Sequence, residues 1–164
     1  LMRIFSCYGE EKFAKSIARI IVSRREKTPF ETTFQLVEAI KDGIPARARR
    51  EGGHPAKRVF QAVRIEVNNE SVDLAPSIEK MFNALKVGGT LSIITFHSLE
   101  DRTVKNMFRG FTEGCTCPKD FPVCVCGNTP RGRLKFKSMA PSAEELERNP
   151  RSHSARLRSI EKLR

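Results

Sequence analysis

The sequence predicts an α/β fold in which a helical region precedes a region that contributes strands to a sheet. In the first seventy residues, apolar side chains recur at helical spacing, as Phe13, Ile17 and Ile21 do. Further on, the β-branched apolar run TLSIITF (residues 90–96) follows the pair Gly88-Gly89 and precedes a second helical pattern. The order helix, turn, strand, helix is typical of an α/β sheet.

The helical region contains three expected helices. They cover residues 10–25, 32–43 and about 56–69, with a basic, glycine-containing loop at residues 47–55. Thr32 or Thr33 can cap the second helix, and Gly43 together with Pro45 can end it.

The second region mixes strands with short helices. We expect a helix at residues 78–85, a strand at 90–96, a helix at 99–109, a strand at 134–139, a helix at 143–148 and a basic closing strand at 155–163. The run at 90–96 is continuously apolar, as in a strand that is buried on both faces. Gly110 is expected to end the helix at residues 99–109.

The charge balance favours a polyanionic partner. The 164 residues include 30 Lys and Arg against 19 Asp and Glu, which gives a formal net charge of +11. Such an excess suits nucleic acid, although it can also serve solubility alone. No apolar stretch approaches the roughly 18 residues of a membrane span, and no signal peptide is recognised. We therefore expect a cytoplasmic protein without a membrane partner.

Polar residues gather where the expected strand 90–96 passes into the next helix. His97, Glu100 and Arg102 lie at the carboxyl end of this strand, the edge of an α/β sheet at which ligands bind. His97 can exchange hydrogen bonds near neutral pH, and Arg102 can hold a phosphate. Ser98 and Asp101 have the spacing of a capping box, so they either serve only the helix or belong to the site.

A polar stripe runs along the expected helix 56–69. Lys57, Gln61, Arg64 and Asn68 recur on one side of this helix, next to its apolar face. Two cations and two amides can contact phosphates and base edges together. The alternative is an ordinary solvated helix face.

Four of the five cysteines fall within twelve residues. They form the pairs Cys115-x-Cys117 and Cys124-x-Cys126, whereas Cys7 stands alone and is expected to be a small core residue. In a cytosolic protein such a cluster favours a structural Zn²⁺ with four thiolate ligands over disulfides. Free or redox-active thiols are the alternative.

The basic tail and one absence complete the pattern. Arg151 precedes the closing strand, and Arg156 and Arg158 share one face of it, where they can bind phosphate or keep a solvated edge from aggregating. The sequence has no G-x-G-x-x-G motif and no P-loop, and Gly88-Gly89 precedes a strand rather than following one. It therefore offers no glycine-rich cofactor loop.

Four segments together point to a family. They are YGEEKFAKSIARIIVSRR, HPAKRVFQAVRIEVNNE, FHSLEDRTVKNMFR and NPRSHSARLRSIEKL, and they span nearly the whole chain. In this order they resemble the MraW/RsmH family of small-subunit rRNA methyltransferases. The Cys-rich segment is similar to an insert found in some branches of that family.

The resemblance implies a Rossmann-like methyltransferase domain with a helical domain inserted in it. On this mapping, residues 1–69 are most of the inserted substrate-recognition domain. Residues 70–164 are the C-terminal part of the Rossmann-like sheet, with the Cys-rich insert at 115–126. The family's cofactor-binding glycine motif would lie upstream of Leu1. We therefore expect no cofactor-binding residues in this chain and no activity of the chain alone.

The resemblance also implies an activity. Family members transfer a methyl group from S-adenosylmethionine to N4 of a cytidine in the decoding region of 16S rRNA, so 16S rRNA or the small ribosomal subunit is the expected partner and DNA is not. The target-pocket candidates are His97, Ser98 and Glu100. The RNA-binding candidates are Lys57, Gln61, Arg64, Asn68, Arg102, Arg151 and Arg156. No residue is assigned as the catalytic base.

An alternative function of another class uses the same features. A zinc-stabilised, non-catalytic RNA-binding protein would need the basic surface and the cysteine cluster but no cofactor.

Overall fold

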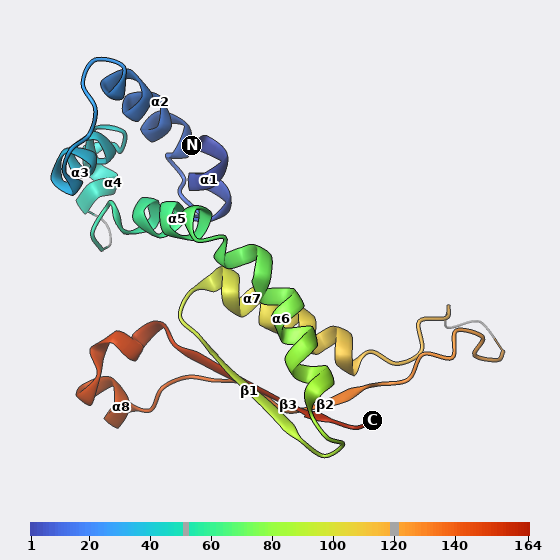
Figure 1. The fold of residues 1–164 in the computed structure, drawn as a ribbon. Coiled ribbons are helices and arrows are strands. Elements are labelled where there is room, and N and C mark those ends of the chain that lie inside the picture. Colours follow the sequence, from blue (N-terminus) through green and yellow to red (C-terminus); the bar gives the residue numbers. More distant parts are fainter. Residues whose placement is uncertain (51–52, 119–121) are drawn as a thin grey trace. The chain divides into compact units, whose positions relative to one another are not determined.

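The computed structural model describes residues 1–50, 53–118 and 122–164. These residues form two compact units, Leu1–Glu70 and Ser71–Arg164 (Figure 1). Among the described residues, no helix combines the length and the apolar content that crossing a membrane requires.

The first unit is helical and has its own core. Its helices are α1 (Met2–Cys7), α2 (Ala14–Arg25), α3 (Thr33–Asp42), α4 (Ala46–Arg50) and α5 (Lys57–Val67). Phe5, Ile17, Ile40 and Val59, which come from four of these helices, are at most 1% exposed and belong to one apolar cluster. The unit therefore holds together around side chains that are far apart in the sequence.

Capping residues in the sequence predicted both ends of α3, but the start of α2 differs from expectation. Thr32 caps α3 in a full capping box with Gln35, and Gly43 follows its last residue, as expected. The helix expected at residues 10–25 begins instead at Ala14. Glu10 has a φ of 47°, a left-handed conformation that no α-helix includes, so the helix cannot start there.

The basic loop expected at residues 47–55 is partly wrong. Residues 46–50 form the short helix α4, whereas residues 51–52 lie outside the described residues. Towards the end of the segment, His54 Nδ1 accepts a hydrogen bond from the Ala56 backbone N–H at 3.3 Å. Helix α5 begins at the next residue, Lys57. Its bounds agree with those of the expected helix to within two residues.

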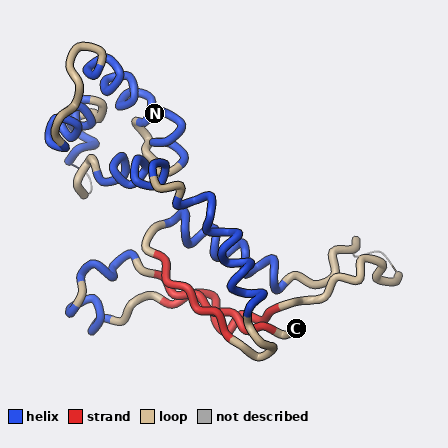
Figure 2. The backbone as a smooth tube through the Cα atoms, viewed as in Figure 1, coloured by secondary structure: helices blue, strands red, loops and turns tan. Residues whose placement is uncertain are grey.

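The second unit combines helices with a small sheet. Its elements are α6 (Glu70–Ala84), β1 (Thr90–Thr95), α7 (Ser98–Thr112), β2 (Gly132–Met139), α8 (Ala143–Arg148), the 3-10 helix Pro150–Ser154 and β3 (Arg156–Lys162). The strands form an antiparallel sheet in the order β1-β3-β2, drawn in red in Figure 2. The chain is therefore a mixed α/β protein, and its described strands do not display the parallel order typical of a Rossmann-like sheet.

Helices α6 and α7 pack on this sheet and build the second core (Figure 1). The rings of Phe82 on α6 and Phe111 on α7 stack with centroids 4.1 Å apart. Ile160, at the centre of β3, is fully buried in the same cluster. Burial of these large apolar side chains is the main contribution to the stability of this unit.

Helix α7 passes through Gly110, which was expected to end it. The helix continues to Thr112, and the buried Phe111 lies in its last turn. Glycine in a helix interior costs about 1 kcal/mol relative to alanine. The stacking of Phe111 on Phe82 offsets that cost, so tertiary packing overrides the local stop signal.

Strand β1 is not buried on both faces, contrary to expectation. Leu91 and Ile93 pack against the helix-covered core, but Ile94 on the opposite face is 59% exposed. Side chains alternate along a strand, and in the described residues the helices of this unit's core cover only the face that bears Leu91 and Ile93. A continuous apolar run was therefore not sufficient to identify two buried faces.

Strand β3 lies in the middle of the sheet rather than at a closing edge. It pairs with β1 on one side and with β2 on the other. Ser159 of β3 is 2% exposed, and its hydroxyl lies 2.9 Å from that of Ser92 on β1. At the C-terminal end of β3, the expected Gly88-Gly89 turn is present before β1, and the Gly88 N–H donates to the Lys162 carbonyl at 2.8 Å.

Ile160→Ala should lower the free energy of unfolding by about 2–5 kcal/mol, because it leaves a cavity between the sheet and its helices. Ile94→Ala on the same sheet is the matched control and should cost less than about 1 kcal/mol, since this side chain is 59% exposed. Urea denaturation measures both values. Equal losses would show that the core has been wrongly located.

Candidate functional site

The junction between β1 and α7 is shaped by His97. This residue is the N-cap of α7, with extended backbone angles, and its Nδ1 accepts the Glu100 backbone N–H at 3.3 Å. A histidine in this role replaces the usual Ser, Thr, Asp or Asn. Because Nδ1 acts as an acceptor, the neutral imidazole carries its proton on Nε2.

Glu100 folds back over the same junction. Its Oε2 accepts the Phe96 backbone N–H at 3.0 Å, and its Oε1 lies 3.1 Å from His97 Nε2. That second contact has the distance of an ion pair but not the geometry of a hydrogen bond, so Nε2 has no hydrogen-bond partner among the described residues. The His97 side chain is only 12% exposed. Both residues therefore have a structural role that the sequence did not reveal.

The capping pair expected at Ser98 and Asp101 is displaced by one residue. His97 provides the cap, and Ser98 is the exposed first residue of α7. Asp101 turns instead towards β3 and forms an ion pair with Arg158. The spacing of three residues therefore indicated that a cap is present but did not identify His97 as the capping residue.

The Asp101–Arg158 ion pair joins α7 to the central strand. Arg158 Nε and Nη2 donate to the two carboxylate oxygens at 2.7 and 2.8 Å, and the side chains are 13% exposed for Arg158 and 24% for Asp101. The hydrogen bonds from Arg158 lower the pKa of Asp101 and outweigh the opposing effect of burial. Asp101 in turn raises the pKa of Arg158.

Further hydrogen bonds connect this ion pair to all three strands. Thr95 Oγ1, at the end of β1, lies 3.4 Å from Asp101 Oδ1 and 3.3 Å from the Arg156 carbonyl oxygen, and its hydroxyl donates to these two acceptors. Arg158 Nη1 donates to the Lys137 carbonyl of β2 at 2.5 Å. The site expected at this sheet edge is therefore held by a connected polar network.

The RNA-binding candidates of this unit lie on its surface. Arg156 is exposed and pairs with Thr95 in the strand register, close to the junction. Arg102 is exposed on α7, and Arg151 is exposed in the 3-10 helix. Arg102 and Arg156 both lie within a few residues of the ion pair that fixes the junction.

The polar stripe of the first unit has intramolecular partners. Arg64 donates to both carboxylate oxygens of Glu70, with distances of 2.9 to 3.2 Å, and Asn68 Nδ2 donates to Glu70 Oε1 at 3.1 Å. Gln61 Nε2 donates to the Tyr8 carbonyl at 3.4 Å, and Lys57 is exposed. Binding an RNA phosphate at Arg64 would therefore compete with Glu70.

The four clustered cysteines converge as the sequence predicted. Their Sγ atoms all lie within 4.8 Å of one another, whereas Cys7 lies in α1 and is exposed rather than buried in the core. Backbone N–H groups of Asn128 and Thr116 lower the pKa of Cys126 to about 5. The Cys117 backbone N–H favours the Cys115 thiolate, but the neighbouring sulfurs together raise the pKa of Cys115 to about 11.

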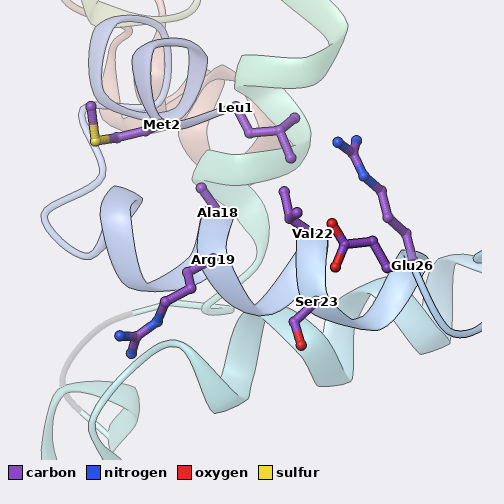
Figure 3. Close-up of a pocket in the computed structure, with 8 residues that line it drawn as sticks. Leu1, Met2, Ala18, Arg19, Val22, Ser23 and Glu26 are labelled. Carbon is purple, nitrogen blue, oxygen red and sulfur yellow. The ribbon is translucent and has the colours of Figure 1, made fainter.

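One surface hollow does not qualify as a cofactor site. It lies between α1 and α2 and is lined by Leu1, Met2, Ala18, Arg19, Val22, Ser23, Arg25 and Glu26 (Figure 3). The Arg19 and Ser23 side chains point away from Leu1 and Met2 in this view. Small-molecule sites place a few polar groups so that they converge on the ligand, and this hollow does not.

Arg158 was expected to bind phosphate or to keep a solvated edge from aggregating, but its side chain is only 13% exposed and pairs with Asp101. Its place beside Arg156 on one strand face was visible in the alternation of the tail, but its partner Asp101 is 57 residues away. No local spacing marks such a pair. Only the strand order and the position of α7 bring the two side chains together.

A model of the MraW methylase family matches residues 1–163, which is almost the whole chain. The chain belongs to this family. The resemblance seen in the four ordered segments is thereby confirmed.

Curated relatives agree with the family assignment. Proteins named "Ribosomal RNA small subunit methyltransferase H" from Paenibacillus sp. (strain JDR-2) and Carboxydothermus hydrogenoformans are 56% and 57% identical over 164 residues, or 99% of this chain and 52% of each relative. The protein of that name from Clostridium botulinum (strain Loch Maree / Type A3) is 55% identical over 99% of this chain and 53% of its own length. The chain spans about half the length of the curated relatives it matches.

Replacing Asp101 should make stability less dependent on pH. Because the folded-state pKa of Asp101 is lowered, its contribution is complete above about pH 5 and is lost as the pH falls below the ordinary aspartate value of about 3.9. Asp101→Asn should cost about 1–2 kcal/mol at pH 7 and less at pH 3, measured by urea denaturation.

The control for this prediction is Glu144→Gln. Glu144 pairs with Arg148 on α8, where the side chains are 71% and 75% exposed, so the loss should be below about 0.5 kcal/mol. A cost of Asp101→Asn that stays constant between pH 7 and pH 3 would contradict the stabilising role of the ionised carboxylate.

Proposed function

We propose that this chain forms part of an enzyme that methylates N4 of a cytidine in the decoding region of 16S rRNA, with S-adenosylmethionine as the methyl donor. The observation that carries the proposal is the family match over residues 1–163, together with relatives more than 50% identical that are named rRNA methyltransferases. The net charge of +11 supports an RNA substrate. The enzyme would act in the cytoplasm on 16S rRNA or the small ribosomal subunit.

The two units would divide the work. Residues 1–69 would form most of an inserted RNA-recognition domain, with the stripe on α5 as its contact surface. Residues 70–164 would supply the C-terminal edge of a Rossmann-like sheet, and the Cys-rich insert would extend from it. Arg102, Arg151 and Arg156 would contact phosphates near the β1–α7 junction, because all three are exposed.

The described residues do not fit S-adenosylmethionine by themselves. A cofactor loop needs free backbone N–H groups at a helix N-terminus that follows a strand. In the described part of the chain, two strands lead into helices, and neither connection is glycine-rich: the first is Phe96-His97 and the second is Ala140-Pro141-Ser142. The cofactor would therefore depend mainly on residues that this chain does not contain, and the chain alone would be inactive.

Its own residues would handle the target base. The N4 amine is a weak nucleophile because its lone pair is delocalised into the ring, so the base must be held in the reactive orientation. A flipped or single-stranded cytidine gives the necessary access. His97, Ser98 and Glu100 would line that pocket at the start of α7.

This arrangement orients the base rather than removing its proton. The Nδ1 lone pair of His97 already accepts the Glu100 N–H, and Glu100 Oε2 accepts the Phe96 N–H. N4 must lose one proton when it gains the methyl group. We assign that proton to no residue of this chain.

A chimera tests the proposal. Residues 1–163 of this chain would replace the matching segment of the Paenibacillus relative, to which they are 56% identical. The chimera should transfer labelled methyl groups to 16S rRNA at one cytidine, identified as N4-methylcytidine by mass spectrometry of nuclease digests. This chain alone should transfer none. A folded chimera that binds S-adenosylmethionine but leaves the rRNA unmodified would contradict the proposal and favour the non-catalytic RNA-binding alternative.

Arg156→Gln in the chimera should weaken rRNA binding. It should also lower the slope of log affinity against log salt concentration by the amount expected for one lost phosphate contact. Lys80→Gln is the matched control, because Lys80 is exposed on α6 and lies outside the proposed surface. Filter binding over a series of salt concentrations measures both. Equal effects of the two substitutions would exclude a specific role for Arg156.

A further inference from the structure

In its described residues, the loop between α7 and β2 has no buried side chains to support it. It covers residues 113–131, and its described residues contain neither helix nor strand. None of the described side chains in 113–130 is buried. A loop of this length without secondary structure is uncommon in a compact domain.

The ends of this loop are nevertheless fixed. The Arg131 N–H donates to the Phe111 carbonyl at 2.8 Å, which brings the start of β2 back to the last turn of α7. Asn128 Nδ2 donates to the Gly114 carbonyl at 2.8 Å. These two bonds form the neck of the loop, and the cysteines lie beyond it.

The two Cys-x-Cys pairs meet in an irregular loop. The backbone of each pair is neither helix nor strand, yet the four sulfurs lie within 4.8 Å of one another. Val123 and Val125 alternate with the second pair and are 70% and 74% exposed. The four sulfurs of the loop thus lie close to one another while its valine side chains are exposed to solvent, so no hydrophobic core brings the cysteines together.

The distances between sulfur atoms match a tetrahedral metal centre. Four of the six distances are 3.2 Å for Cys115–Cys124, 3.5 Å for Cys124–Cys126, 3.7 Å for Cys115–Cys126 and 4.0 Å for Cys117–Cys124, and all six are within 4.8 Å. Four sulfurs at about 2.3 Å from a central zinc lie about 3.8 Å from one another. A disulfide would require about 2.05 Å, and all four cysteines are free.

Backbone groups complete the surroundings of the sulfurs. The Thr116 N–H donates to Cys126 Sγ and the Val125 N–H to Cys117 Sγ, each at 3.4 Å. Donors of this kind stabilise negative charge on coordinating thiolates. They reach one sulfur of each pair, so each Cys-x-Cys pair has a backbone donor from the opposite arm of the loop.

We propose that Cys115, Cys117, Cys124 and Cys126 bind one structural Zn²⁺ ion that holds the 113–131 loop in place. Four protein ligands fill the tetrahedral shell and leave no open position for a substrate or water, so the metal has no catalytic role. Binding releases the thiol protons, and the ion takes over the stabilising role that buried side chains have elsewhere in this unit.

Metal analysis tests the site directly. The full chain, purified under reducing conditions without chelator, should contain about one zinc per chain by plasma mass spectrometry. Substituting Co²⁺ should give the absorption bands of tetrahedral thiolate coordination. Less than about half an equivalent of zinc with all five thiols reactive, or a mass four daltons lower from two disulfides, would overturn the proposal.

Cys117→Ser combined with Cys124→Ser should reduce the bound zinc to a small fraction of an equivalent. Cys7→Ser is the matched control, because it removes the fifth cysteine, which lies in the other unit, and should leave the zinc content unchanged. Circular dichroism checks that each variant keeps its helices. Full zinc content in the folded double variant would show that these cysteines are not the ligands.

Hydrogen exchange tests the structural role separately from the binding. Removing zinc should accelerate exchange at 113–118 and 122–130 while the amides of β3 stay protected, because the described loop residues have no core contacts. Unchanged exchange in the loop after zinc removal would contradict the structural role. Neither measurement depends on methyltransferase activity.

Discussion

The arrangement of the second unit depends on the ion pair between Asp101 and Arg158. It joins the first turn of α7 to the central strand β3 across 57 residues of sequence, and both side chains are largely buried. A buried pair of this kind contributes modestly to net stability, but removing one partner leaves an uncompensated charge. Since His97 and Glu100 lie in the same first turn, this pair also fixes the position of the proposed target pocket.

Features encoded by short segments could be predicted from the sequence, whereas features that depend on distant contacts could not. A cap at Thr32 or Thr33, an end of that helix at Gly43 and a helix at Ala143–Arg148 were all expected from short stretches of sequence, and the structure has Thr32 as the cap. The continuation of α7 past Gly110 depends on stacking with Phe82 of another helix. The central place of β3 and the pairing of Arg158 depend on the order of strands, which the pattern of apolar residues does not specify.

The candidate site combines both kinds of feature. The sequence identified the segment from His97 to Arg102 correctly as the start of a helix at a strand end, and it identified the cysteine cluster. It did not identify His97 as the cap or Glu70 as the partner of Arg64 and Asn68, because both roles depend on side-chain placement. Under the proposed function, the polar stripe on α5 would recognise RNA, and the β1–α7 junction would hold the target base.

Ultraviolet cross-linking of the chain to 16S rRNA, followed by mass spectrometry of the linked peptides, tests most directly whether these two surfaces face the RNA. Linked peptides should come from residues 57–68 of α5 and from residues 96–102 at the β1–α7 junction. The acidic first turn of α8, with Glu144 and Glu145, should remain unlinked because it repels phosphate. Cross-links confined to α8 or to the exposed face of the sheet that carries Ile94, with none at α5 or the junction, would contradict this account.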